Sequence, residues 1–144
     1  MDKLDDGAAP GMAAQADRPA AAGRARVTVV QMAMRPRATA EVFYADMETY
    51  VRAAAAYESD FVVFPELFTL QLLTAEPARL TPEAAIERLS EHTDAFVARL
   101  RTWAVEHRVN IIGGSHPTRI EGGAIRNIAY TALRDGTVHA QEKL

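Results

Sequence analysis

A glutamate at the end of an apolar run is the residue in this sequence whose position most suggests chemistry. Residues 61–64 form an unbroken run of β-branched and aromatic residues, which predicts a strand buried on both faces. Pro65 cannot donate to a sheet ladder, so the strand is expected to end there, with Glu66 at its carboxyl end. A carboxylate in such a place is costly unless it has a partner or a function. On local sequence alone, the commoner alternative is a glutamate that turns to solvent or caps a loop.

The elements before Glu66 have the order of a β-α-β unit. Residues 27–33 predict a first strand, mostly buried, and Thr39 can cap a helix that runs to about Tyr57. This helix has one apolar stripe, formed by Phe43, Met47, Tyr50, Val51 and Ala54. Strand, helix and strand at this spacing imply parallel pairing with a right-handed crossover.

The rest of the chain predicts two more helices and then antiparallel strands. The expected elements are an irregular stretch at 67–80, helices at 81–89 and from about 93, a strand at 110–115, and strands at 125–133 and 137–143. Asp135-Gly136 is the strongest hairpin signal in the sequence, so the last two strands should pair antiparallel and the sheet should be mixed. The fold class is therefore α/β.

Composition limits the functional classes. The chain has 144 residues, 49% of them apolar, a formal net charge of -3 and no cysteine. Lys and Arg do not cluster, no apolar stretch approaches the ~20 residues of a membrane span, and no signal peptide is recognisable, so we expect a cytoplasmic protein without nucleic-acid or membrane partners. Residues 1–25, rich in Ala, Gly and Pro, predict a disordered tail before a domain at 26–144.

Several motifs, taken in order, resemble the nitrilase superfamily of carbon-nitrogen hydrolases. The resemblance extends over residues 27–144, the N-terminal half of that domain. Its motifs are Phe64-Pro65-Glu66-Leu67-Phe68, Ile111-Ile112-Gly113-Gly114-Ser115, Asn127, Asp135-Gly136 and Glu142-Lys143-Leu144. The sequence around Asp60 and around His116 is most similar to a branch of this superfamily that is sometimes fused to an acetyltransferase-type domain.

The resemblance implies an αββα sandwich that usually dimerises, with a Glu-Lys-Cys triad that acts on small amides, nitriles or carbamoyl compounds. Glu66 matches the family's general base and Lys143 its lysine, while the cysteine normally follows further along the chain. The sequence is therefore expected to be an N-terminal fragment, inactive alone and prone to fold poorly because one sheet face stays uncovered. Without the resemblance, a lysine near a chain end is usually just solvated.

The implied chemistry explains the residue types. A desolvated carboxylate has a raised pKa, so it can take a thiol proton and return it to the leaving amine. A fixed ammonium stabilises the charge that develops on the carbonyl oxygen. A thioester then forms, and water or another acceptor resolves it.

Two other functions remain open, and no cofactor or metal is expected. The alternatives are a non-catalytic relative that keeps the sandwich as a binding module, and an acyltransferase on the same scaffold. The four histidines, His92, His107, His116 and His139, lack metal-ligand spacing, and no nucleotide-binding motif is present. His116 follows a strand end and is a weak candidate for lining the pocket, without a catalytic role. Asn127 and Gly136 are interpreted as structural residues of the hairpin.

Overall fold

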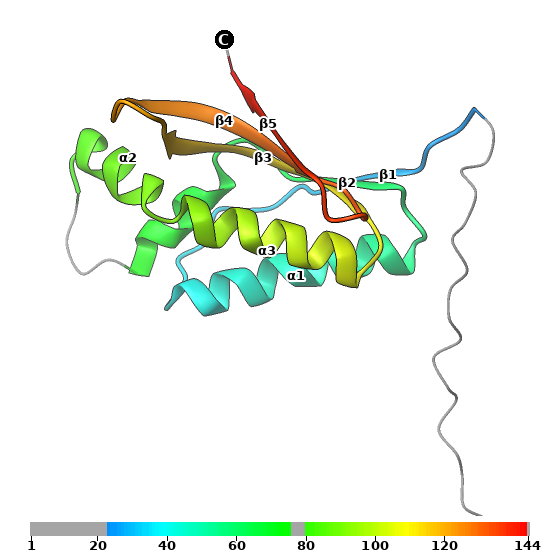
Figure 1. The fold of residues 1–144 in the computed structure, drawn as a ribbon. Helices are drawn as coiled ribbons and strands as arrows, with labels where there is room; N and C mark the ends of the chain where they lie inside the picture. Colours follow the sequence, from blue (N-terminus) through cyan, green and yellow to red (C-terminus); the bar gives the residue numbers. More distant parts are fainter. Residues whose placement is uncertain (1–22, 76–79, 144) are drawn as a thin grey trace, which may run out of the picture.

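A mixed sheet of five strands, with helices packed on one face, forms the part of the chain that can be described (Figure 1). The structure is a computed structural model that describes residues 23–75 and 80–143. Its strands are β1 (Val27–Val29), β2 (Phe61–Val63), β3 (Asn110–Arg119), β4 (Ile125–Ala132) and β5 (Val138–Glu142). Residues 1–22 of the expected tail, residues 76–79 of the expected irregular stretch, and Leu144 lie outside the described residues.

The strands lie in the sheet in the same order as in the sequence. β1 pairs parallel with β2 and β2 with β3, whereas β3, β4 and β5 form an antiparallel meander. The predicted β-α-β unit and the predicted mixed sheet are confirmed. This α-on-β arrangement corresponds to one half of the expected four-layer sandwich.

The helices α1 and α2 begin where the sequence provides side-chain caps. Before α1 (Ala40–Ala56), the Thr39 hydroxyl accepts a hydrogen bond from Val42 N at 3.3 Å, and before α2 (Pro82–Ser90) the Thr81 hydroxyl accepts one from Ala84 N at 3.2 Å. The third helix, α3, spans Thr93–Glu106. The stretch expected to be irregular contains a 3-10 helix, η1, at Phe68–Ala75. None of the described helices is long and apolar enough to cross a membrane.

A cluster of aromatic rings fills the space between the helices and the sheet. Phe68, the first residue of η1, lies at its centre, with ring centroids 4.9 Å from Phe64 and 5.8 Å from both Phe43 and Phe96. All four rings are at most 3% exposed. Phe68 therefore anchors the backbone two residues after Glu66 to the core.

Two expectations about the strands were wrong. β1 ends at Val29 instead of Ala33, and it is an edge strand with Val27 and Val29 50% and 72% exposed. Among the described residues its neighbour in the sheet is β2, which covers just three residues, and the backbone pairing of β1 with β2 ends with the bond from Val30 N to Val63 O. β2 itself is fully buried only at Val62, because its other side chains face the side of the sheet without helices.

Candidate active site

A β-bulge in β3 shapes the region after β2. Ile112 pairs with Thr131 and Ser115 with Ala129, so three steps along β3 match two along β4 and one residue is extra. The bulge shifts the alternation of side chains, which places His116 against Phe96 of α3 and leaves the neighbouring Ser115 near Glu66.

Gly114 in this bulge is required by a close backbone approach. Its φ is +63°, and a Cβ at this position would lie 2.2 Å from the Pro65 carbonyl oxygen. Only glycine allows both the left-handed backbone and the approach to Pro65. At Gly114, the glycine pair of this motif thus serves a close approach between two backbones.

Glu66 follows β2 in a turn held to β3. The Phe64 amide donates to Ile112 O at 2.9 Å and the Leu67 amide to Ser115 O at 3.1 Å. Leu67 has a φ of +54°, a left-handed conformation that costs a non-glycine residue about 1–2 kcal/mol. Because bonds to β3 on both sides fix this backbone, Glu66 projects from a defined position at the carboxyl end of β2.

Lys143 reaches the same place from β5, the strand at the opposite edge of the sheet. It follows β5, its amide donates to Asn127 O at 2.9 Å, and its Nζ lies 2.5 Å from Glu66 Oε1. These two residues, the ones singled out in the sequence, are 77 positions apart. The structure brings them into direct contact.

Asn127 is a site residue that sequence reasoning assigned only to the hairpin. Its backbone does pair with Lys143, but its side-chain Nδ2 also donates to Glu66 Oε1 at 3.2 Å. The alternation of side chains along β4 was the signal in the sequence that could have placed the Asn127 side chain on the face of the site. Asn127 shares a face with Ile125, Ala129 and Thr131, opposite the buried Ile128 and Tyr130.

The electrostatics of Glu66 differ from the expectation of a desolvated carboxyl. Its pKa is held below the ordinary value, first by the hydrogen bond from Lys143, then by the lysine's charge, with a smaller contribution from Asn127. Ser115 acts in the same direction, although its Oγ makes no hydrogen bond among the described residues. The side chains of Glu66 and Lys143 are 50% and 54% exposed, so desolvation is too weak to raise the pKa. The raised pKa was therefore a wrong expectation for this chain.

His116 faces the core and not the site. It is fully buried, its Nδ1 lies 2.9 Å from Thr69 Oγ1, and burial lowers its pKa to about 4. It does not contact Glu66 or Lys143. These contacts make His116 a hydrogen-bonded residue of the core and do not support its expected place in the pocket lining.

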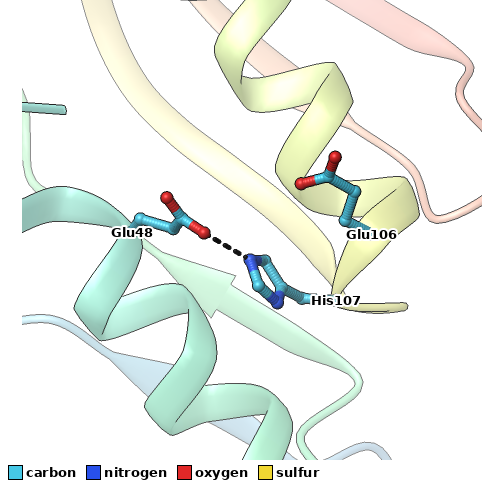
Figure 2. Close-up of side chains that lie close together, drawn as sticks. All are labelled: Glu48, Glu106 and His107. Atoms are coloured by element: carbon cyan, nitrogen blue, oxygen red, sulfur yellow. Dashed lines mark hydrogen bonds and ion pairs between the residues drawn. The ribbon is translucent and has the colours of Figure 1, made fainter. Parts of the chain in front are cut away.

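Glu48, Glu106 and His107 form a group that could hold a metal ion (Figure 2). Their potential ligand atoms lie within 4.8 Å of one another, and His107 Nε2 is 3.0 Å from Glu48 Oε1. The group lies where α3 ends, before β3 begins, whereas Glu66 lies beyond the opposite end of the parallel strands. We interpret the group as a contact between α1 and α3, separate from the Glu66–Lys143 site.

Comparison with known proteins places this geometry in context. The carbon-nitrogen hydrolase family profile matches residues 26–143. The chain is 43% identical over 119 residues to "Probable hydrolase YhcX" from Bacillus subtilis (strain 168), a match that covers 83% of this chain and 23% of that protein.

Solved structures of related proteins share the fold. A carbon-nitrogen hydrolase from Helicobacter pylori G27 superposes with a TM-score of 0.65 at 18% identity, over 83% of this chain and 39% of that one. An amidase from Nesterenkonia sp. AN1 gives a TM-score of 0.63 at 21% identity, over 84% and 44%. This chain thus spans less than half the length of each of these relatives.

Proposed function

Because this chain belongs to the carbon-nitrogen hydrolase family, we propose that Glu66 and Lys143 are the general base and the oxyanion-stabilising lysine of a hydrolase acting on small amides, nitriles or carbamoyl compounds. The observation that carries the proposal is the 2.5 Å contact between these two side chains, which come from distant strand ends.

Glu66 has the properties of a proton acceptor. Its lowered pKa keeps it ionised at neutral pH, so it can take the proton of an attacking thiol and pass it to the departing amine. The same carboxylate can then deprotonate a water molecule that attacks the resulting thioester. Glu66 returns that proton to the departing thiolate, so the thiol is regenerated and Glu66 is ionised again. An amide consumes one water and releases one acid and one amine or ammonia, whereas a nitrile consumes a second water before ammonia leaves.

Lys143 has the properties of an electrostatic stabiliser. Its ammonium is fixed by Glu66 Oε1 and by the backbone bond of Lys143 to Asn127, so it needs little reorganisation when negative charge develops on the substrate oxygen. A positive group that is already in place lowers the barrier more than one that must be recruited.

The sulfur in this mechanism has to come from outside the 144 residues, which contain no cysteine. The Nesterenkonia amidase is described with an active-site cysteine, and we propose an equivalent thiol in the complete protein. The other features proposed for the complete protein are a cytoplasmic location, assembly as a homo-oligomer, and a place in the branch that is sometimes fused to an acetyltransferase-type domain.

Ammonia release by the complete protein tests the proposal. Supplied with a panel of small amides and nitriles, the protein should turn over at least one of them. Glu66→Gln should lower kcat/KM about 10²–10⁴-fold, and Lys143→Met about 10²–10³-fold. Glu142→Gln is the matched control, since this neighbouring carboxylate contacts Arg126 and not the site.

The same assay separates the alternatives. Full activity in Glu66→Gln would refute the assignment, and a protein that binds amides without turnover would indicate the binding module. If an added amine is converted to a new amide faster than the free carboxylic acid accumulates, the protein is an acyltransferase, because ammonia leaves when the thioester forms in both reactions.

A further inference from the structure

We propose that Asn127 is a positioning residue that leaves only one oxygen of Glu66, Oε2, available to carry the transferred proton. This inference rests on the proposed function of Glu66. It concerns a side chain that the sequence analysis assigned only to the hairpin.

Asn127 contacts both members of the pair through different atoms. Its Nδ2 donates to Glu66 Oε1 at 3.2 Å, and its carbonyl oxygen accepts the Lys143 amide at 2.9 Å. In the sheet, Asn127 lies opposite Pro117 of β3, and its backbone is bonded to Lys143 on the other side. Asn127 thus contacts both charged residues from β4, the strand that lies between β3 and β5.

The two donors converge on the same carboxylate oxygen. Lys143 Nζ lies 2.5 Å from Oε1, and Asn127 Nδ2 is the second donor to that atom. A carboxylate oxygen has two lone pairs in its plane, so these bonds occupy both acceptor positions of Oε1. A proton taken from a thiol or from water then has to add to Oε2.

The amide orientation of Asn127 is fixed by this contact. Its Oδ1 is buried and has no hydrogen-bond partner among the described residues. Turning the amide over would place Oδ1 against Glu66 Oε1, and two acceptors would then face each other. The orientation in which Nδ2 donates to Glu66 is preferred, although it leaves the buried Oδ1 without a partner. This is the arrangement expected if the function of Asn127 depends on the Nδ2 donor.

Loss of the Asn127 donor has two consequences. Glu66 loses one hydrogen bond to its charged form, so its pKa rises toward the ordinary value. Of the described residues, Lys143 alone then still holds Oε1, so the carboxylate can rotate and the proton can add to either oxygen. We expect a loss in kcat with little change in KM, since the residue positions the base and does not bind substrate.

Two variants of the complete protein test this. Asn127→Ala removes the side chain, and Asn127→Asp keeps its shape but replaces the donor by a carboxylate. The Glu66 pKa is measured by carboxyl NMR on protein with labelled glutamate, with Glu66→Gln to assign the signal. We expect the pKa to rise in both variants, more in Asn127→Asp because of like-charge repulsion, and kcat to fall about tenfold or more with KM changed less than about threefold. Thr131→Ala, on the same face of β4, is the matched control.

The NMR readout does not depend on turnover, so the two proposals fail separately. Full activity in Glu66→Gln refutes the proposed function and leaves the titration result standing. A Glu66 pKa unchanged from wild type in the Asn127 variants, or an unchanged kcat in an otherwise active enzyme, overturns the role of Asn127. If one variant does not fold, the other still gives the titration.

Discussion

Replacing Gly114 by alanine should be the most disruptive single-methyl change at the site. At its φ of +63°, a non-glycine residue costs about 1–2 kcal/mol. The added Cβ would also lie 2.2 Å from Pro65 O and 2.9 Å from Pro65 C, which are backbone atoms that no rotamer change can move. Relieving such an overlap costs about 1–3 kcal/mol, so the expected total loss is about 2–5 kcal/mol.

A second glycine separates the two contributions. Gly123 has a φ of +87°, but no atom lies within 4 Å of a Cβ built there, so Gly123→Ala should cost only the backbone penalty of about 1–2 kcal/mol. Urea unfolding followed by circular dichroism gives both values, provided the m-value stays constant. Equal losses in Gly114→Ala and Gly123→Ala would refute the reasoning, because the close approach to Pro65 would then carry no energy.

Three further outcomes follow from the structure. The folded-state pKa of His116 is about 4, below the ordinary 6.5, so the stability linked to this residue is complete above about pH 6.5 and falls by up to about 3 kcal/mol as the pH drops to 4. Urea midpoints measured from pH 6.5 to pH 4 check this, because the midpoint should fall more in wild type than in His116→Gln. Thr81→Ala should lower stability by about 1 kcal/mol through loss of the cap on α2, as measured by the same unfolding assay. The 144-residue chain, which lacks cysteine, should release no ammonia from amides, and turnover above blank would contradict the proposed chemistry.

The sequence predicted these helices and strands well because the capping and turn residues that define them lie next to each element in the chain. Thr39 makes the expected cap bond, the helix expected at 81–89 begins after the capping residue Thr81, and the strands on either side of Asp135-Gly136 pair as a hairpin. The contact between Glu66 and Lys143, by contrast, could not be derived from spacing. It came from the family resemblance, since nothing local in the sequence relates residues 77 positions apart.

The features that were missed depend on neighbours in space. The length of β1 is limited by β2, and the bulge at Gly114 depends on how β3 meets Pro65, so neither is encoded in its own segment. The lowered pKa of Glu66 depends on how much of its carboxyl is covered, which composition does not reveal. Asn127 was assigned to the hairpin because its backbone does belong to the hairpin. Its side-chain contact with Glu66 depends on the positions of β2 and β4 on either side of β3.

The strand order has a consequence for how the chain acquires its native state. The β3–β5 meander joins sequence neighbours through short turns, whereas β1, β2 and β3 meet only after two long helical crossovers. Pairing between sequence-distant segments is slow, since the entropy of closing a long loop is lost before any contact compensates for it. The meander should thus form early, and the approach of Lys143 to Glu66 should be among the last events. Time-resolved detection of that ion pair would report the completion of folding.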